Sequence, residues 1–395
     1  MKALVTGSAG FIGSNVVRAL LMGGHDVRAL HLPNEDLRNL RGLEVERVPG
    51  DVTDLTKMRG AIRGCEVVFH LAAVYALWSK DEGVMQRVNV EGTRNVLAAA
   101  RAEGVRRVVH TSSIARFGGQ GPRARATEES AFALGSTGDV YSRSKADAHE
   151  VAVRASSDQD VVIVAPCGPI GPGDAGPTPT GRLLLSAVKM PVVVVADTTT
   201  NFADVRDMAV AHVLAAERGK RGETYLLGCR DVSLVEIARM ALDALGVTKR
   251  IVVAPFVAAS IAARGLRFVA DRVTRRPPLF TPEAVRIAKL GLRADSESSS
   301  GDVHEPPRSG RWRGRRDGEG ADAGRGHARG RDVERRNIAP QEGCKLHIYA
   351  RRRVYRAWRL GCSSTKASCT SSVAWRVCPG GNRASRARAS LRRPA

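Results

Sequence analysis

The chain opens with Met1-Lys-Ala-Leu-Val-Thr-Gly7-Ser-Ala-Gly10-Phe-Ile-Gly13. Apolar residues 3–5 predict a short strand, and apolar residues at helical spacing up to Leu21 predict a helix directly after the glycines. In such a unit the first glycine permits the tight turn, the second lets a pyrophosphate approach the backbone, and the third lets the helix pack on the strand. The helix N-terminus favours the same anion. We therefore predict a dinucleotide site at Gly7, Gly10, Phe11, Ile12 and Gly13, the alternative being a glycine-rich turn without a ligand.

The positive charge of the chain is concentrated at its C-terminal end. The 395 residues include 62 Lys and Arg against 40 Asp and Glu, a net charge of +22. Residues 293–395 hold 24 of these basic and 10 of these acidic residues, a net of +14, which leaves +8 for residues 1–292. The first part therefore has the charge of an ordinary enzyme, and nucleic acid is not an expected partner except through the basic tail.

Several classes of site and location are not expected. The seven cysteines show no paired or metal-ligand spacing, which predicts a reducing compartment and no metal site. A strand within three residues of the N-terminus argues against a signal peptide. The apolar run Ile251–Ala263 is interrupted by Pro255 and is too short for a transmembrane segment, so we expect a buried or membrane-surface helix there. A cytoplasmic protein is the resulting expectation.

Strands alternate with helices through the first half of the chain. Strands are expected at 27–30, 45–48, 67–69, 107–110 and 161–165, and helices at 55–62, 82–102 and 141–155. This alternation predicts an α/β fold with a Rossmann-type, doubly wound parallel sheet. We expect a dinucleotide-binding domain over 1–165. A smaller substrate-binding part, interleaved with that core, is expected over 166–294, with strands at 191–195 and 224–227 and helices at 234–245 and 281–288.

Ligands of such sheets bind beyond the carboxyl ends of the strands, and several residues follow those ends. Asp51, followed by Val52, is placed to accept a hydrogen bond from an adenine amino group. The small residues of Leu71-Ala-Ala73 let a cofactor lie close to the backbone. Pro166 and Gly168 follow the strand at 161–165, near where a nicotinamide amide needs partners. His70, directly before Leu71, has no partner that the sequence reveals, so we interpret it as a packed residue.

The choice of dinucleotide depends on the end of the second strand. An acid there binds the ribose 2′-OH of NAD, whereas an arginine accommodates the 2′-phosphate of NADP. This chain has His31 followed by Leu32, and Arg38 or Arg41 follows within reach of a phosphate. The pattern favours NADP but leaves both NAD and NADP open, because both arginines can equally be solvated surface residues.

Tyr141 and Lys145 form the chemical part of the predicted site. Their four-residue spacing puts the phenol and the ammonium on one helix face. A neighbouring cation, joined by an oxidised nicotinamide, favours the phenolate and makes Tyr141 a usable acid or base. The hydroxyl of Ser112 or Ser113 would orient the substrate oxygen. The pair alone is common by chance, and its weight comes from the order of the parts.

The whole pattern resembles the extended short-chain dehydrogenase/reductase family, also called the NAD-dependent epimerase/dehydratase family. The matching motifs are Gly7 to Gly13, Gly50-Asp51, His70 to Ala73, Asn89-Val-Glu-Gly-Thr93, Thr111 to Ser113, and Tyr141 with Lys145. The resemblance implies that Tyr141 is the acid/base, Lys145 its partner and Ser113 the catalytic hydroxyl. It places Asp51, Val52 and Ala72 on the adenosine side of the cofactor.

Within the family the chain is similar to hopanoid-associated sugar epimerases and dihydroflavonol 4-reductase-like proteins. The similar segments are Tyr75 to Trp78, Gly171 to Asp174, Pro177 to Gly181 and Asn201 to Asp207. Two departures stand out: His31-Leu32 replace the usual cofactor-selecting residues, and Arg206 stands where an acid is frequent. The stretch 168–181 is expected to be a long loop on the substrate side.

The resemblance implies an NAD(P)-dependent enzyme with a small-molecule substrate. Our first hypothesis is a sugar or nucleotide-sugar epimerase that transfers a hydride away and back. The alternatives are a one-way carbonyl reductase of the dihydroflavonol 4-reductase type and, in another class, a non-catalytic NAD(P)-binding regulator. The sequence leaves open whether the protein forms a homodimer.

The composition changes abruptly near residue 295. The Arg-, Gly- and Ser-rich stretch 295–395 lacks apolar periodicity, so we expect disorder. It can be a nucleic-acid-binding extension, an inert tail or an out-of-frame translation product. We favour the last, because the change falls inside what should still be the substrate part.

Overall fold

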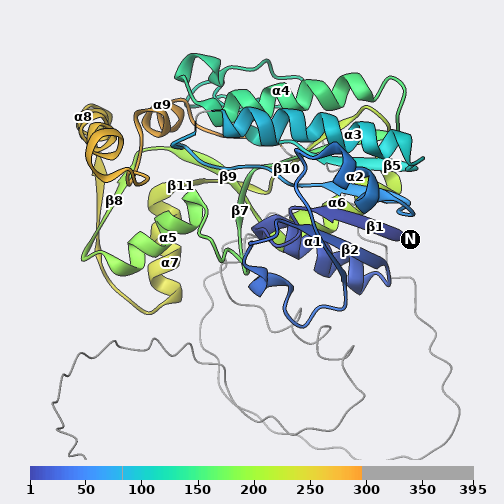
Figure 1. Cartoon of the computed structure of the whole chain (residues 1–395). Helices are drawn as coiled ribbons and strands as arrows, with labels where there is room; N and C mark the ends of the chain where they lie inside the picture. Colours follow the sequence, from blue (N-terminus) through green and yellow to red (C-terminus); the bar gives the residue numbers. More distant parts are fainter. Residues whose placement is uncertain (82, 296–395) are drawn as a thin grey trace, which may run out of the picture. The chain divides into compact units, whose positions relative to one another are not determined.

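The computed structural model describes residues 1–81 and 83–295 (Figure 1). A seven-stranded sheet has the order β10-β6-β5-β4-β1-β2-β3, with every neighbouring pair parallel. Its strands are β1 (Lys2–Thr6), β2 (Asp26–His31), β3 (Glu46–Pro49), β4 (Val67–His70), β5 (Arg107–Thr111), β6 (Val161–Pro166) and β10 (Thr224–Leu227). The predicted Rossmann-type, doubly wound sheet is confirmed, and the strand order reverses between β1 and β4.

Alternating side chains divide the core into two layers. Helices α1 (Phe11–Met22) and α6 (Val205–Arg218) cover one face, and α2 (Leu55–Ile62), α3 (Gly92–Ala102) and α4 (Val140–Ala155) cover the other. On β1, Ala3 and Val5 pack toward the first layer and Leu4 toward the second. Both faces of β4 and β6 are buried, which explains why these strands read as continuous apolar runs, whereas β3 at the sheet edge is largely exposed.

A smaller lobe extends from the carboxyl side of this sheet (Figure 1). It contains a three-stranded sheet of β7 (Gly168–Ile170), β9 (Thr199–Asp204) and β11 (Arg230–Ser233), and a parallel pair of β8 (Val192–Ala196) and β12 (Arg250–Ala254). Its helices are α5 (Pro179–Lys189), α7 (Leu234–Ala244), α8 (Phe256–Val269) and α9 (Pro282–Leu290). The short helices, which are spread over both parts of the described chain, are η1 (Leu37–Leu40), η2 (Gln86–Glu91, a π-helix), η3 (Ile114–Arg116), η4 (Leu134–Thr137) and η5 (Ala270–Thr274, a π-helix). The division at residue 165 stays a prediction, and residues 166–294 return α6 and β10 to the main sheet.

Two expected elements differ in the structure. The long loop 168–181 is reduced to 171–178, because its first residues form β7 and its last residues begin α5. A Cβ at Gly168 would lie 2.5 Å from the Phe202 ring, so only glycine allows β7 to pair with β9 here. The helix expected over 82–102 begins at residue 84 and contains the π-helical turn η2.

The apolar run 251–263 divides into two elements. Pro255 lies between β12 and α8, as expected for a residue that has no N–H to donate. Of the 14 residues of α8, all of them described, only Ala263 is buried, so the expectation of a buried helix was wrong. No helix in the described part of the chain is both long and apolar enough to cross a bilayer. The predicted tail, apart from Asp295, lies outside the described residues.

His70 is a packed residue, as its sequence context predicted. Thr93 donates its hydroxyl to the Asn89 carbonyl, so its oxygen accepts from His70 Nε2 at 3.0 Å. His70 Nδ1 then accepts from the Thr6 hydroxyl at 2.9 Å. Burial lowers the pKa of His70 to about 3, so this chain of bonds holds a neutral imidazole.

The buried histidines predict acid sensitivity. Burial lowers the pKa of His149 and His212 to about 4, and that of His110 well below its usual 6.5. Each takes up a proton on unfolding that the native state does not hold. The free energy of unfolding should therefore fall as pH drops from 6.5 toward 4, by up to ~1.4 kcal/mol per pH unit for each histidine.

His110→Leu tests this with urea unfolding at pH 7 and pH 5. Neither His110 ring nitrogen has a hydrogen-bond partner within residues 1–81 and 83–295, so we expect the variant to be at least as stable as wild type at pH 7. We also expect a smaller loss at pH 5. An unchanged loss on acidification would contradict the account.

Candidate active site

The first and third glycines of the opening turn are required by the fold itself. Gly7 has φ +64°, and a Cβ there would lie 2.9 Å from the Ala72 backbone. A Cβ at Gly13 would lie 2.1 Å from the Gly7 carbonyl oxygen. At Gly10 the same atom would meet only that oxygen, at 3.1 Å. Packing therefore leaves open space at Gly10, where a dinucleotide requires the backbone to be accessible.

The start of α1 has no side-chain cap, because its N-cap residue is Gly10. Several other helices are capped by the carboxylate or hydroxyl of the preceding residue, namely Asp54, Asp139, Asp204, Ser233 and Thr281. The first N–H groups of a helix lack partners within the helix. At α1 they are free to bind a pyrophosphate, so the turn fits the predicted cofactor.

The predicted adenosine-side residues follow the ends of neighbouring strands. The Thr6 hydroxyl oxygen accepts from the N–H groups of Leu71 and Ala72, both at 3.1 Å, and so aligns the ends of β1 and β4. Leu71 and Ala72 are half-buried and Ala73 is exposed. Because the strands are parallel, the residues that follow β1 to β5 lie along one edge of the sheet.

At that edge, three predicted residues differ in what they offer a ligand. Asp51 is half-buried, and its carboxylate accepts from Thr53 N at 2.9 Å. Val52 is buried against the start of α3. A Cβ at Gly92 would lie 2.6 Å from the Val52 side chain, so the glycine lets α3 pack closely on Val52. His31 ends β2 and is buried, with Nδ1 2.9 Å from the Leu32 carbonyl.

Arg38 does not present a free charge. It lies in η1, exposed, and its Nε donates to Asp36 Oδ2 at 2.5 Å. The hydrogen bond between the two raises the pKa of Arg38 and lowers the pKa of the Asp36 carboxyl. A 2′-phosphate would compete with Asp36 for this arginine, so the residue does not decide between NAD and NADP.

Two asparagines that the sequence did not single out join the turn to the substrate lobe. Asn39 Nδ2 donates to the Ala9 carbonyl at 3.0 Å and to the Gly173 carbonyl at 2.9 Å. Asn15 Nδ2 donates to the Pro172 carbonyl at 3.1 Å. The loop 171–178 is thereby attached to the cofactor turn. In the sequence, the signal for such a role is an asparagine among the residues of a helix; the structure then shows that Asn15 is buried and Asn39 half-buried.

Tyr141 and Lys145 lie one turn apart near the start of α4. Asp139 caps this helix by accepting from Tyr141 N at 3.3 Å and Ser142 N at 2.8 Å. Lys145 is buried, and its Nζ donates to the Thr111 carbonyl, at the end of β5, at 2.7 Å. Burial lowers the pKa of Lys145 to about 8. The helix therefore brings the ammonium to the same strand end that carries the serines.

The phenol keeps its proton at neutral pH. Burial raises the pKa of Tyr141 to about 12, and a hydrogen bond with the Ser113 hydroxyl offsets part of that rise. The predicted phenolate also requires an oxidised nicotinamide beside the phenol, so it stays a prediction; in the chain alone desolvation is the largest influence on this pKa. Ser113 is half-buried, whereas Ser112 is buried with its hydroxyl 3.2 Å from His149 Nδ1. Ser113 is therefore the serine that faces Tyr141.

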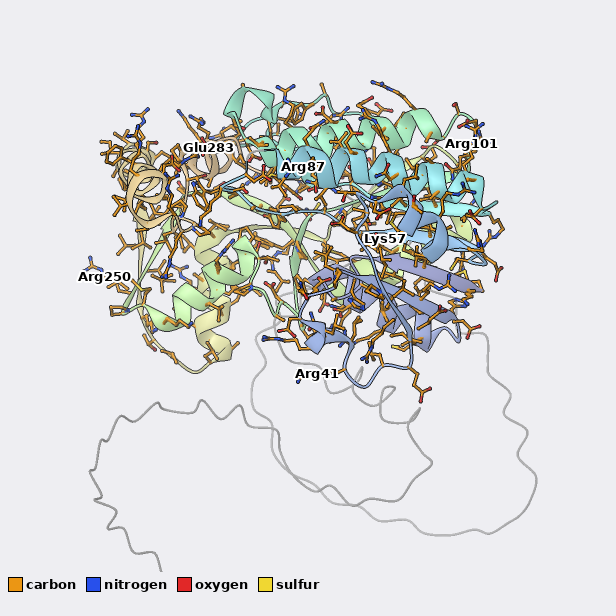
Figure 2. The ribbon with its side chains drawn as sticks, viewed as in Figure 1. Arg41, Lys57, Arg87, Arg101, Arg250 and Glu283 are labelled. Atoms are coloured by element: carbon orange, nitrogen blue, oxygen red, sulfur yellow. The ribbon has the colours of Figure 1, made fainter. Side chains whose placement is uncertain are left out.

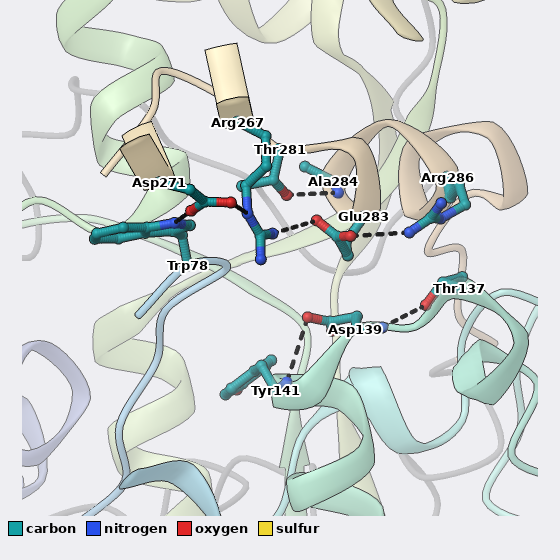
Figure 3. Close-up of polar contacts among 10 residues, drawn as sticks. All are labelled: Trp78, Thr137, Asp139, Tyr141, Arg267, Asp271, Thr281, Glu283, Ala284 and Arg286. Carbon is teal, nitrogen blue, oxygen red and sulfur yellow. Dashed lines mark hydrogen bonds and ion pairs between the residues drawn. The ribbon is translucent and has the colours of Figure 1, made fainter. Parts of the chain in front are cut away.

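A loop after β4 connects this group to the smaller lobe. The Tyr75 ring lies 4.6 Å from the Tyr141 ring, centroid to centroid. Trp78 Nε1 donates to Asp271 Oδ1 at 2.8 Å, and Arg267 pairs with Asp271 at 2.8 Å (Figure 3). These contacts pack Tyr75 on the phenol and attach Trp78, in the same loop, to the smaller lobe.

The remaining predicted positions lie next to this group in the sheet. Pro166 ends β6, the neighbour of β5, and is buried, while Gly168 begins β7. Arg206, where an acid is frequent in the family, donates from Nε to Asp204 Oδ1 at 2.9 Å. Asp204 also caps α6, so this substitution adds a local ion pair away from the Tyr141 group. Among the described residues no cluster of side chains could hold a metal ion.

Comparison with known families places this site in its class. Residues 3–228 match the model of the NAD dependent epimerase/dehydratase family. The chain therefore belongs to this family and is an NAD(P)-dependent enzyme of the extended short-chain dehydrogenase/reductase type.

Individual relatives narrow the similarity. The chain is 42% identical over 235 residues to a Synechocystis protein named as a dihydroflavonol 4-reductase, covering 58% of this chain and 68% of that protein. It is 34% identical over 313 residues to sterol demethylase protein B of Methylococcus capsulatus, covering 78% and 94%. The crystal structure of gox2253 superposes with a TM-score of 0.66 at 34% identity, covering 76% of this chain and 92% of that one.

Gly10 and Gly13 should respond differently to substitution by alanine. Gly13→Ala forces a backbone clash and should lower the free energy of unfolding by ~2–3 kcal/mol. Gly10→Ala should leave unfolding within ~1 kcal/mol of wild type but weaken NADH or NADPH binding at least tenfold. Urea unfolding and fluorescence titration of the reduced cofactor measure both. Undiminished cofactor binding by a folded Gly10→Ala variant would contradict the assignment.

Lys145 should reduce stability while serving the site. Its pKa of about 8 lies below the ordinary 10.5, so folding disfavours the charged form. The penalty is full below pH 8 and is relieved as pH rises toward 10.5. Lys145→Met should therefore stabilise the cofactor-free protein at pH 7 by roughly 1–3 kcal/mol, and by less at pH 9.5.

The matched control is Lys80→Met, at an exposed position. Its free energy of unfolding should stay close to wild type at both pH values. A Lys145→Met variant that is less stable than wild type at pH 7 would show that the lysine holds the fold rather than the site.

Proposed function

We propose that the protein is an NAD(P)-dependent reductase that interconverts a ketone and a secondary alcohol on a substrate with a large apolar body. The observation that carries this proposal is the convergence of Tyr141, Ser113 and Lys145 at the end of β5: the buried ammonium of Lys145, one helical turn from Tyr141, donates to the Thr111 carbonyl, and Ser113 lowers the pKa of the Tyr141 phenol. A proton donor, an orienting hydroxyl and a cation together are what carbonyl reduction requires.

When bound at this site, a reduced nicotinamide would supply the hydride for carbonyl reduction, and the chain's own residues orient and protonate the carbonyl oxygen. Ser113 donates a hydrogen bond to the carbonyl oxygen and orients it toward Tyr141. Tyr141 transfers its proton to that oxygen, which becomes the alcohol. Lys145 stabilises the phenolate that remains and, through its other N–H groups, would hold the nicotinamide ribose. In the opposite direction the phenolate accepts the alcohol proton.

The apolar character of the substrate is supported by the Tyr75 ring, which packs on the phenol. Trp78 lies three residues further along the same loop and is fixed by its bond to Asp271. Two relatives, 42% and 34% identical, are named as a dihydroflavonol 4-reductase and as sterol demethylase protein B. For this reason we rank the reductase ahead of the epimerase that the sequence resemblance favoured.

A sugar epimerase remains the second candidate. The family description includes epimerases, and the motif segments around Gly171 to Asp174 resemble those of sugar epimerases. The same catalytic residues serve both reactions, so cofactor consumption separates them. With cofactor at one tenth of the substrate concentration and no recycling system, a reductase stops after one equivalent of NAD(P)H, whereas an epimerase continues.

The role of Tyr141 can be tested against a neighbouring tyrosine. Tyr141→Phe removes the proton donor and should lower kcat for reduction by ~10²–10⁴. Tyr75→Phe keeps the ring beside the phenol and should change kcat only a few-fold. Steady-state oxidation of NADPH over a panel of ketones measures both. Full activity of Tyr141→Phe would refute both mechanisms, and NADPH binding by wild type without any turnover would favour the non-catalytic regulator.

A further inference from the structure

One face of α8 is apolar and open to solvent. Val257, Ile261 and Phe268 are 73%, 65% and 63% exposed. Their spacing of four and seven residues places them on one side of the helix, with Arg264 between them. Soluble proteins rarely leave such a stripe uncovered, so this face indicates a binding surface.

The same surface continues beyond the helix with alternating apolar and basic residues. Val273 and Leu279 are 70% and 77% exposed. Exposed arginines accompany them, and none of these forms an ion pair in the described part of the chain: Arg264, Arg272, Arg275 and Arg276. We call the exposed apolar and arginine residues between 257 and 279 the α8 surface.

The charge of this region is nearly all of one sign. Residues 246–282 contain seven Lys and Arg and a single acid, Asp271. That acid is already bonded to Trp78 and Arg267. Arg250, at the start of β12, adds a further exposed cation at the outer edge of the same lobe (Figure 2). The α8 surface therefore combines uncompensated positive charge with apolar side chains.

We propose that the α8 surface docks on an anionic lipid bilayer surface. Apolar side chains of an interfacial helix enter the boundary between headgroups and acyl chains, while arginines reach the phosphates. A second copy of the chain suits this surface poorly, because a two-fold interface would set like-charged arginines against each other. Residues 296–395 suit it poorly for the same reason, since they are strongly basic.

Docking would bring the site close to the bilayer surface. Asp271, next to Arg272, receives the hydrogen bond of Trp78, and Tyr75 in the same loop packs on Tyr141. The loop beside the phenol is thus attached directly to the α8 surface. The docking itself does not depend on which reaction the site catalyses, so it can be tested without a substrate.

The test uses the full chain and vesicles of phosphatidylcholine, alone or with 30% phosphatidylglycerol. We expect co-sedimentation with the anionic vesicles. Ile261→Ser with Phe268→Ser should weaken partitioning at least tenfold, because two apolar side chains no longer enter the bilayer. The matched control, Met22→Ser with Val210→Ser, removes similarly exposed apolar residues elsewhere and should partition like wild type.

A local readout separates the α8 surface from the basic tail. Amide hydrogen exchange of residues 256–276 should slow when anionic vesicles are added. Arg264→Gln with Arg272→Gln should weaken partitioning, whereas Arg106→Gln with Arg154→Gln should not. Equal partitioning of all variants without protection of 256–276 would overturn the proposal in favour of binding through the tail. A vesicle-free dimer abolished by Ile261→Ser with Phe268→Ser would overturn it in favour of self-association.

Discussion

The structure depends on the close approach of three backbone segments at the end of β1. Gly7 turns with positive φ against the Ala72 backbone, and Gly13 brings the first turn of α1 against the Gly7 carbonyl. No side chain fits at either contact. The start of α1, whose N-cap Gly10 has no side chain, is uncapped and lies at the end of β1, where the strand order reverses. One steric constraint thus sets both the helix packing and the position of an anion site.

The catalytic group is placed by the same sheet. Parallel pairing carries the end of β5 to the edge that holds the glycine turn, and Lys145 binds the last carbonyl of that strand. Burial then sets the protonation states: it raises the pKa of the Tyr141 phenol, which stays protonated, and lowers the pKa of Lys145, whose ammonium loses its proton more easily. Proton donation to a substrate oxygen follows from that arrangement.

Local patterns predicted much of this arrangement. The strand, turn and helix at the N-terminus, the helix Leu55–Ile62 and the strand Thr224–Leu227 have the expected bounds or nearly so, because each combines regular apolar periodicity with a clear start or stop. What the sequence could not predict lies in contacts between distant residues. Asn39 and Gly173 are 134 positions apart, and Trp78 and Asp271 are 193 apart. The exposure of α8 likewise depends on tertiary surroundings that periodicity does not contain, whereas the pairing of Arg38 with Asp36 is local and its two residues were both visible in the sequence.

The most direct test of the central claim is a crystal structure of the chain with bound NADPH or NADH. The account predicts that the pyrophosphate oxygens accept hydrogen bonds from backbone N–H groups of residues 11–13, at the start of α1, and that the nicotinamide lies beside Tyr141 with its ribose on Lys145. A dinucleotide bound with its pyrophosphate away from the start of α1, or with its nicotinamide remote from Tyr141, would contradict it.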